Sequence, residues 1–302
     1  MESVSLDFSK RLTDQRFWLA ALGAALAGFH LQALWTATDG NSEALVTQVL
    51  FWLAIGSLLW SRKETLRLES QPLPSAIGLV LIGLVLLKGG GTFLNPFAQF
   101  APFVSALALA LLASGLGGLK QYVKELALAA TLVSTVLWEN ALSLKAIAQV
   151  TAKLAYAFLW YTGFDVHISG TNIMLPTGAV DVYEGCSGFH GMAQLFKLSI
   201  LFLLTFETKG WIRKVITPLI AVAIAFFTNA IRVALMAILV AGGDKNAFFY
   251  WHEGEGSNIF SLVSMLLFGL FCYTQMASED EPDEPDEPGT PAELPVQESQ
   301  SV

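Results

Sequence analysis

The sequence predicts an all-α polytopic membrane protein with about eight transmembrane helices, an interfacial amphipathic helix and a small extracytoplasmic β-like loop. Composition gives the first indication, because 54% of the residues are hydrophobic and only 14% are charged, whereas soluble domains carry about 25% charged residues. The mean hydropathy of +0.56 points the same way. The apolar residues also gather into runs of about 20, the length that an α-helix needs to cross a bilayer.

Several apolar segments of this length follow one another along the chain. They lie near residues 17–35, 44–60, 74–90, 97–115, 122–139, 189–206, 215–241 and 259–275. The first segment lacks the pattern of a cleaved signal peptide and is long enough to remain in the membrane. The chain therefore divides into an N-terminus (1–16), an N-terminal transmembrane region (17–121), a membrane core that contains the polar motifs (122–275) and a disordered acidic tail (276–302).

Basic residues indicate how the spans are oriented. They cluster before the first span and after the second, fourth and sixth spans, at Lys10, Arg11, Arg16, Arg62, Lys63, Arg67, Lys120, Lys124, Lys209, Arg213 and Lys214. Lys and Arg are enriched in cytoplasmic loops. We therefore expect both termini to be cytoplasmic and residues 140–188 and 242–258 to lie on the outer face. This corresponds to a multi-pass protein of a bacterial inner membrane, with that face toward the periplasm.

The stretch between the fifth and sixth spans has a different pattern. Residues 144–164 place apolar side chains on one helical face and polar ones opposite, at Ile147, Val150, Leu154, Phe158 and Tyr161 against Lys145, Gln149, Lys153 and Tyr156. This predicts an amphipathic helix in the membrane interface; the alternative is a marginal ninth span. Residues 166–186 combine β-like pieces with Gly and Pro, which predicts a hairpin or a pair of extended strands.

The charge of −8 arises mainly from the C-terminus. Residues 279–302 contain nine of the 25 acidic residues, no Lys or Arg, and a short Asp-Glu-Pro repeat, a composition typical of disorder. The membrane part is about neutral and has no basic field, which argues against nucleic acid as a partner. Two cysteines, Cys186 and Cys272, cannot define a disulfide framework, and we expect both to be free.

Cys186 is the first candidate functional residue. It lies in "VYEGCSGFHG", where a helix is expected to begin, and unpaired N–H groups at a helix start favour a thiolate. Ser187 follows it, and Gly185 and Gly188 would leave room for a substrate backbone to approach. The alternative is a small buried residue without chemistry.

Arg232 and His252 are the next candidates. An arginine in a membrane helix is costly, and 17 residues of helix from residue 215 would carry Arg232 about 25 Å, to the outer edge of the bilayer core. Asn229 lies on the same face and could orient a neighbour. His252, in the outer loop, titrates near neutral pH and can act as acid or base. The alternatives are a snorkelling anchor and an ordinary surface histidine.

His190 is a rival base, because it follows Cys186 by four residues. With Gln194 and Lys197 it forms a polar stripe that should face the bundle interior. His167, Asp181 and Glu184 could shape a substrate groove, whereas His30 and Cys272 are expected to pack. Glu253 and Glu255 beside His252 lack the spacing of a zinc motif, so we expect no metal and no other cofactor.

Taken together, Cys186, His252 and Arg232 provide a nucleophile, a proton carrier and a fixed cation on one side of the membrane. Such a set supports acyl transfer. The motifs "EGCSG" and "NAIR" and the later histidine resemble the exosortase/archaeosortase family, whose signature is Cys-Ser-Gly, then Asn-x-x-Arg, then His. The resemblance covers roughly residues 122–275, and the cyanobacterial-type subgroup is one candidate.

The resemblance implies a membrane-embedded cysteine transpeptidase or protease. Its catalytic residues would be Cys186, Arg232 and His252, supported by Ser187, Gly188 and Asn229. Its partners would be secreted proteins with a C-terminal Pro-Glu-Pro-type motif, a transmembrane helix and a basic cluster. Cleavage would pass through a thioester, which water or the amine of an exopolysaccharide or glycolipid acceptor would resolve.

Three other functions stay open from the residues alone. A transporter or channel would use Arg232, Lys197 and His190 as a path, although the sequence has no internal symmetry of the kind common in transporters. A non-catalytic component of surface-polysaccharide export would not need the sulfur of Cys186. A transferase acting on lipid-linked sugar would turn Arg232 toward a phosphate.

Overall fold

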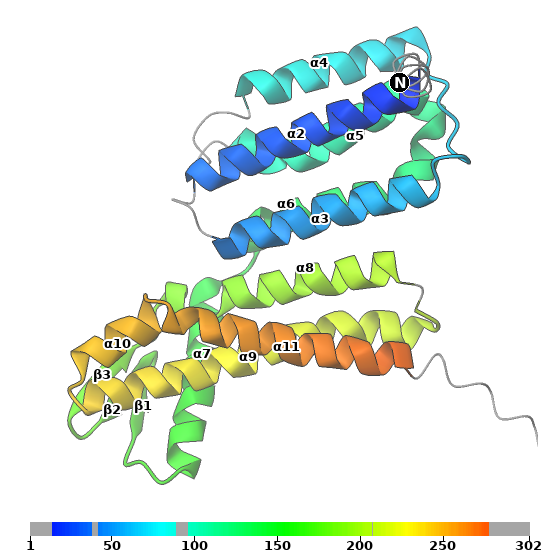
Figure 1. The fold of residues 1–302 in the computed structure, drawn as a ribbon. Helices are drawn as coiled ribbons and strands as arrows, with labels where there is room; N and C mark the ends of the chain where they lie inside the picture. Colours follow the sequence, from blue (N-terminus) through cyan, green and yellow to red (C-terminus); the bar gives the residue numbers. More distant parts are fainter. Residues whose placement is uncertain (1–13, 38–41, 89–95, 207, 278–302) are drawn as a thin grey trace, which may run out of the picture.

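The computed structural model describes residues 14–37, 42–88, 96–206 and 208–277. It confirms the fold class, because long apolar helices run side by side and back and forth along one axis (Figure 1). The predicted acidic tail lies almost entirely outside the described residues, as does most of the predicted N-terminus.

Each predicted span coincides with a helix. These helices are α2 (Gln15–Ala37), α3 (Ser42–Ser61), α4 (Pro72–Lys88), α5 (Pro96–Gly118), α6 (Val123–Ala141), α8 (Phe189–Thr205), α9 (Trp211–Ala241) and α11 (Gly256–Ala277). Among the described residues, five segments are long and apolar enough to cross a membrane, and α3 and α4 supply shorter apolar helices. One of the five, Gln99–Glu139, contains two predicted spans. It reverses direction near the short 3-10 helix η1 (Leu119–Tyr122), and Gly115 leaves the helical conformation at φ 62°.

The outer faces of these helices are apolar. Leu53, Val80, Leu219 and Leu266 are all exposed on the surface of the bundle. A soluble protein rarely exposes a large continuous apolar surface, whereas lipid tails solvate such side chains without cost. The chain is therefore a multi-pass membrane protein.

The two ends of the bundle differ in charge and in structure. Arg16, Arg62, Lys120 and Arg213 come together at the end where α2 starts and α3 stops (right in Figure 1). Arg16 pairs there with Glu64 at 2.7 Å, and Arg62 pairs with the buried Glu125. At the opposite end lie the helices α7 (Leu144–Tyr161) and α10 (Lys245–His252) and the only sheet among the described residues. The basic clusters thus lie at one end of the bundle, as their positions between the predicted spans indicate.

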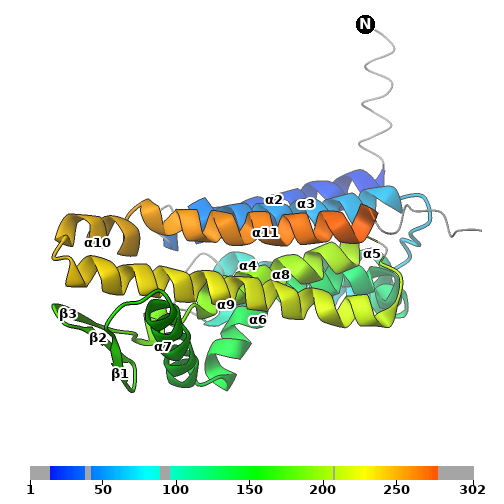
Figure 2. The same ribbon diagram turned by 90° about the horizontal axis from the view of Figure 1, so that it is seen from below.

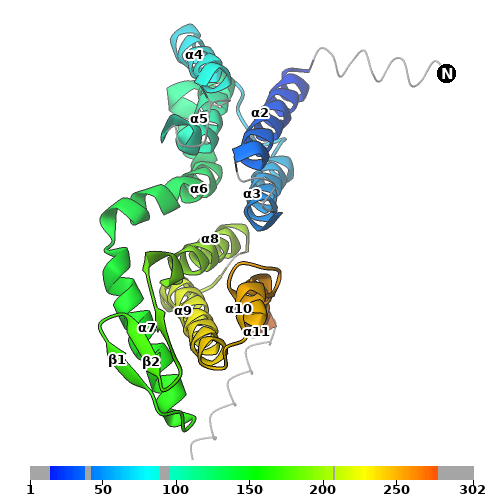
Figure 3. The ribbon, with the colours of Figure 1, turned by 90° about the vertical axis from the view of Figure 1, so that its left-hand side faces the viewer.

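Helix α7 (Leu144–Tyr161) runs across the bundle at this opposite end, as all three views show (Figures 1, 2 and 3). It is not among the segments long and apolar enough to span, which agrees with an interfacial helix. Val150 is 53% and Tyr161 80% exposed, so the large apolar face points away from the protein, as the predicted interfacial helix requires. Small residues, Ala148, Thr151, Ala152 and Ala155, are buried instead, because they let α7 approach α9 closely. The large apolar side chains remain available to lipid.

The segment 166–186 contains three strands rather than the predicted hairpin or pair of extended strands. The strands β1 (His167–Ser169), β2 (Asn172–Leu175) and β3 (Gly178–Asp181) form an antiparallel sheet in the order β1-β2-β3. Ile173 and Val182 are buried in one cluster with the small residues of α7 and with Val233 of α9. The Thr177 hydroxyl also donates to the Ala241 carbonyl at 2.7 Å. The sheet is thus fixed to α9, and its last strand leads directly toward Cys186.

Candidate active site

Cys186 lies in a short 3-10 turn, η2 (Glu184–Cys186), between the sheet and α8. Its backbone N–H donates to the Tyr183 carbonyl at 2.9 Å, and the half-buried thiol is free. Helix α8 begins only at Phe189, so the sulfur precedes the first helical turn. The expected effect of the helix N-terminus on the thiol is therefore not supported by this position.

Gly188 makes the sharp turn between the cysteine and α8. Its φ of 84° is in the left-handed region, which residues with a Cβ rarely adopt. A Cβ there would lie 2.6 Å from Nδ2 of Asn229. Similarly, a Cβ on Gly185 would lie 2.5 Å from the Tyr183 ring. Both glycines make room for side chains of the protein itself, and both also line a neighbouring cavity.

Ser187 is buried. Its hydroxyl accepts from the Phe189 N–H at 3.3 Å, and its carbonyl accepts from the Thr151 hydroxyl at 2.8 Å. These bonds join the start of α8 to α7. Ser187 thus supports the site by positioning the backbone, and Thr151 is a supporting residue that the sequence did not suggest.

His252 ends the short helix α10 (Lys245–His252), which Asp244 caps by accepting from the Ala247 N–H at 2.9 Å. Its Nε2 lies 3.6 Å from the Cys186 sulfur, and its ring stacks on Phe248 with centroids 5.0 Å apart. Nδ1 lies 3.4 Å from a Glu253 carboxylate oxygen. That distance suits an ion pair with a protonated ring, although among the described residues this buried nitrogen makes no hydrogen bond.

Asn229 and Arg232 of α9 bind the backbones of the two candidate residues Cys186 and His252. The Asn229 amide donates to the Cys186 carbonyl at 3.0 Å. Three residues later on α9, Arg232 donates from Nη2 to the His252 carbonyl at 2.7 Å. Its buried Nε has no hydrogen-bond partner among the described residues.

The surroundings of Cys186 act on a thiolate in opposite directions. Burial of the sulfur opposes a negative charge most strongly, and Asp181 adds to this effect. A hydrogen bond from Tyr183 and the positive charge of Arg232 favour the thiolate. The sulfur therefore depends on a neighbouring base to take its proton, and His252 is at the right distance.

Tyr183 is a site residue that the sequence reading missed. Its side chain is 55% exposed, and its pKa is raised, chiefly because a negative charge on Cys186 repels a phenolate. The one feature of the sequence that could have indicated Tyr183 is its position, since it places an aromatic hydroxyl three residues before Cys186.

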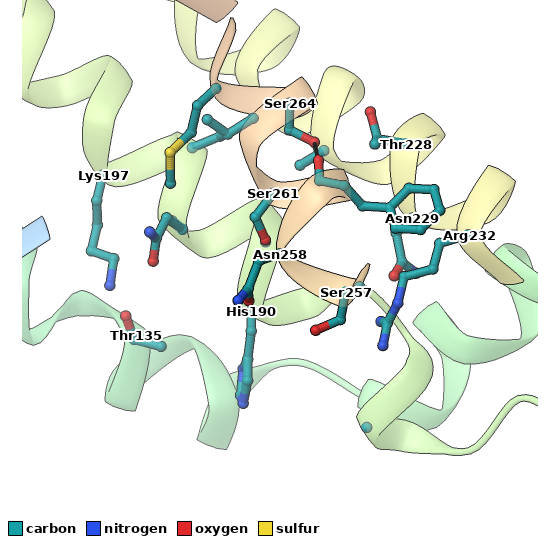
Figure 4. A pocket seen from close by; sticks show the side chains of 18 of the residues that line it. Thr135, His190, Lys197, Thr228, Asn229, Arg232, Ser257, Asn258, Ser261 and Ser264 are labelled. Carbon is teal, nitrogen blue, oxygen red and sulfur yellow. Dashed lines mark hydrogen bonds between the residues drawn. The ribbon is translucent and has the colours of Figure 1, made fainter. Parts of the chain in front are cut away.

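The rival base, His190, lies on a different side of the site. It is 84% exposed, and its Nδ1 is 3.7 Å from a Glu139 oxygen of α6. It lines a polar cavity of about 510 Å³ between α6, α8, α9 and α11, together with Gln194 and Lys197 (Figure 4). Gln194 and Lys197 thus face the interior, as expected, whereas His190 is exposed. Gln194 donates to Thr47 of α3 at 2.9 Å.

The other polar candidates have separate surroundings. His167 is exposed and lies 3.7 Å from Asp165, and Asp181 accepts from the Thr171 hydroxyl at 2.7 Å. His30 is buried and accepts from the Trp52 indole N–H at 3.4 Å. Cys272 is buried and free. The last two agree with the expected packing roles.

The sequence model of the transmembrane exosortase family matches residues 35–269. The chain belongs to this family. The match to the exosortase family includes Cys186, Asn229, Arg232 and His252, and it begins well before the 122–275 region in which the motifs indicated a resemblance.

One relative is an archaeal protein, the probable archaeosortase E of Methanocaldococcus jannaschii. It is 30% identical over 126 residues, which cover 41% of this chain and 65% of the relative. No solved structure matches the chain.

Proposed function

We propose that the protein is a membrane-embedded cysteine transpeptidase or protease that cleaves C-terminal sorting signals of secreted proteins at the outer face of the membrane. The observation that carries the proposal is the 3.6 Å approach of the Cys186 sulfur to Nε2 of His252, with Arg232 hydrogen-bonded to the same histidine. Membership of the transmembrane exosortase family supports it.

The first half of the reaction makes an acyl-enzyme. Nε2 of His252 takes the thiol proton while the sulfur attacks the scissile carbonyl carbon. The negative charge moves to the carbonyl oxygen, where Arg232 stabilises it by charge and by its unpaired N–H. The C–N bond then breaks, His252 returns its proton to the leaving amine, and a thioester on Cys186 remains.

The second half releases the substrate. An incoming amine or a water molecule attacks the thioester, and His252 takes a proton from it. The C–S bond breaks, and the sulfur regains its proton from His252. A glycolipid or exopolysaccharide amine would give ligation, whereas water would give hydrolysis. No step needs a cofactor.

The outward direction of the site is part of the proposal. Arg16, Arg62 and Arg213 lie at the end of the bundle away from Cys186, and basic residues mark the cytoplasmic side. In a bacterial inner membrane, the site would face the periplasm and both termini the cytoplasm. A secreted substrate with a motif, a transmembrane helix and a basic cluster would then present its motif at the level of Cys186.

Gel-shift analysis in cells tests this function. The protein is expressed with a tagged reporter that carries such a signal, and variants are compared at equal protein levels. We expect processing by wild type and by His190→Ala, and its loss in Cys186→Ala, Cys186→Ser, Arg232→Ala and His252→Ala. Processing that survives Cys186→Ala would overturn the nucleophile and favour the transport or assembly function.

A further inference from the structure

The polar cavity is unusual for its position in the bundle. It begins beside Gly185 and Arg232 and follows α8 from near Phe189 to Lys197. Eight helical residues correspond to about 12 Å, so the cavity reaches well below the outer helix ends. Figure 4 shows hydroxyl, amide and charged side chains turned toward this space from four helices, among them Ser261 and Asn258 of α11.

Such a cavity suits a polypeptide that is not helical. Backbone N–H and C=O groups at membrane depth need hydrogen-bond partners, so irregular backbone is tolerated there only where protein or a water-filled cavity surrounds it. A substrate anchored by a C-terminal helix has such a stretch between its scissile bond and its helix. About four extended residues cover 12 Å, the length of the cavity along α8.

The charges of the cavity favour an anion. Lys197 and Arg232 are its cationic residues and Glu139 its acidic one, with His190 beside Glu139 at the outer rim. With a neutral histidine, this leaves one surplus positive charge. Lys197 lies at the inner part of the cavity, where a bound carboxylate would compensate it.

We propose that this cavity binds the stretch of substrate that follows the scissile bond, and that Lys197 recognises an acidic side chain about four residues beyond that bond. The inference rests on the proposed function and assigns a specificity-determining residue to it. His252 contacts the Cys186 sulfur but does not line the cavity, so the acceptor nucleophile would approach the thioester beside His252, outside the cavity.

The charge of the cavity can be measured without a substrate. Ser261→Cys is made in a Cys186→Ala and Cys272→Ala background and is reacted with an anionic and a cationic methanethiosulfonate. For each thiol, the rate with the anionic reagent is divided by the rate with the cationic one. We expect this ratio to be roughly five-fold higher at Ser261→Cys than at an exposed control thiol, Ser169→Cys. Lys197→Gln should abolish the excess. An equal preference at both thiols, or one unchanged by Lys197→Gln, would overturn the anion site.

The ligand is tested with paired reporters that carry Glu or Gln at the fourth residue after the cleavage point. Wild type should process the Glu reporter about ten-fold faster, Lys197→Arg should keep most of the difference, and Lys197→Gln should lose it. Lys153→Gln, an exposed lysine change on α7, is the matched control. Equal losses on both reporters would mean that Lys197 only supports the fold, and our assignment would be wrong.

The two assays separate this inference from the proposed function. If wild type cuts neither reporter while the thiol still prefers the anionic reagent, the transpeptidase function fails and the site serves another anion, such as a lipid phosphate. If both reporters are cut equally well, the transpeptidase function stands and the specificity role of Lys197 is refuted.

Discussion

Replacement of Gly188 by alanine should disable the site while the bundle persists. The new Cβ would lie 2.6 Å from Nδ2 and 2.9 Å from Cβ of Asn229, so one of the two must move. The left-handed φ of 84° adds about 1–2 kcal/mol of strain for a residue with a side chain. Displacing the Asn229 amide also breaks its hydrogen bond to the Cys186 carbonyl, which costs about 1 kcal/mol more.

These terms amount to a local destabilisation of roughly 2–3 kcal/mol. Its effect on catalysis should be larger, because a displacement of about 1 Å in a reacting group can lower a rate about 100-fold. Reporter processing and thermal unfolding in detergent are measured on the same preparations. Gly28→Ala is the matched control, since a Cβ on that α2 residue meets nothing within 4 Å. Wild-type processing by Gly188→Ala would refute the reasoning.

Three further changes test the surroundings of the site. Tyr183→Phe removes a hydrogen bond that favours the thiolate, so the acidic limb of the pH–activity profile should move to higher pH; an unmoved limb would exclude this role. Thr151→Val leaves the buried Ser187 carbonyl without its donor and should lower the free energy of unfolding by about 1–3 kcal/mol, read from denaturation in detergent. Ala152→Leu overpacks the contact of α7 with α9 and should cost about 1–3 kcal/mol in the same assay; a neutral effect would show that the helices separate easily.

The membrane part of the fold could be predicted because its signals are local. A run of apolar residues defines each span, and the basic clusters define which ends lie together, so α2 to α6 and α8, α9 and α11 follow from composition alone. The chain reversal near Gly115 does not break the apolar run, yet the Lys120 cluster marked it. These features depend on transfer free energy, which the sequence contains residue by residue.

The face on which α7 packs could not be predicted in the same way. An interfacial amphipathic helix turns its large apolar residues toward lipid, and that pattern does not specify which other residues contact the protein. The protein contact then selects residues that permit close approach, such as Ala148 and Ala152, as in membrane helix pairs generally. In a bilayer, small residues can therefore be better guides to packing than hydrophobic ones.

The candidate residues of the site were found from the cost of polar groups in an apolar chain, but their mutual roles were not. The sequence placed Cys186, Arg232 and His252 at one level. It did not show that Arg232 bonds the His252 backbone, nor that Tyr183 reaches the sulfur. Those contacts depend on the paths of the short segments η2 and α10, which no local sequence signal specifies.

The arrangement divides positioning from chemistry. Helix α9 supplies Asn229 and Arg232 one turn apart, and each binds a backbone carbonyl, of Cys186 and of His252 respectively. The proposed reactive side chains, Cys186 and His252, lie on the short segments η2 and α10, outside the long helices. Because both segments are tied to one helix, the distance between sulfur and imidazole is set by the helical spacing of α9 rather than by the flexible loops. Burying an arginine in a membrane helix costs free energy. The hydrogen bond from Arg232 to the His252 carbonyl gives a physical reason, besides its charge, why an arginine is present there despite this cost.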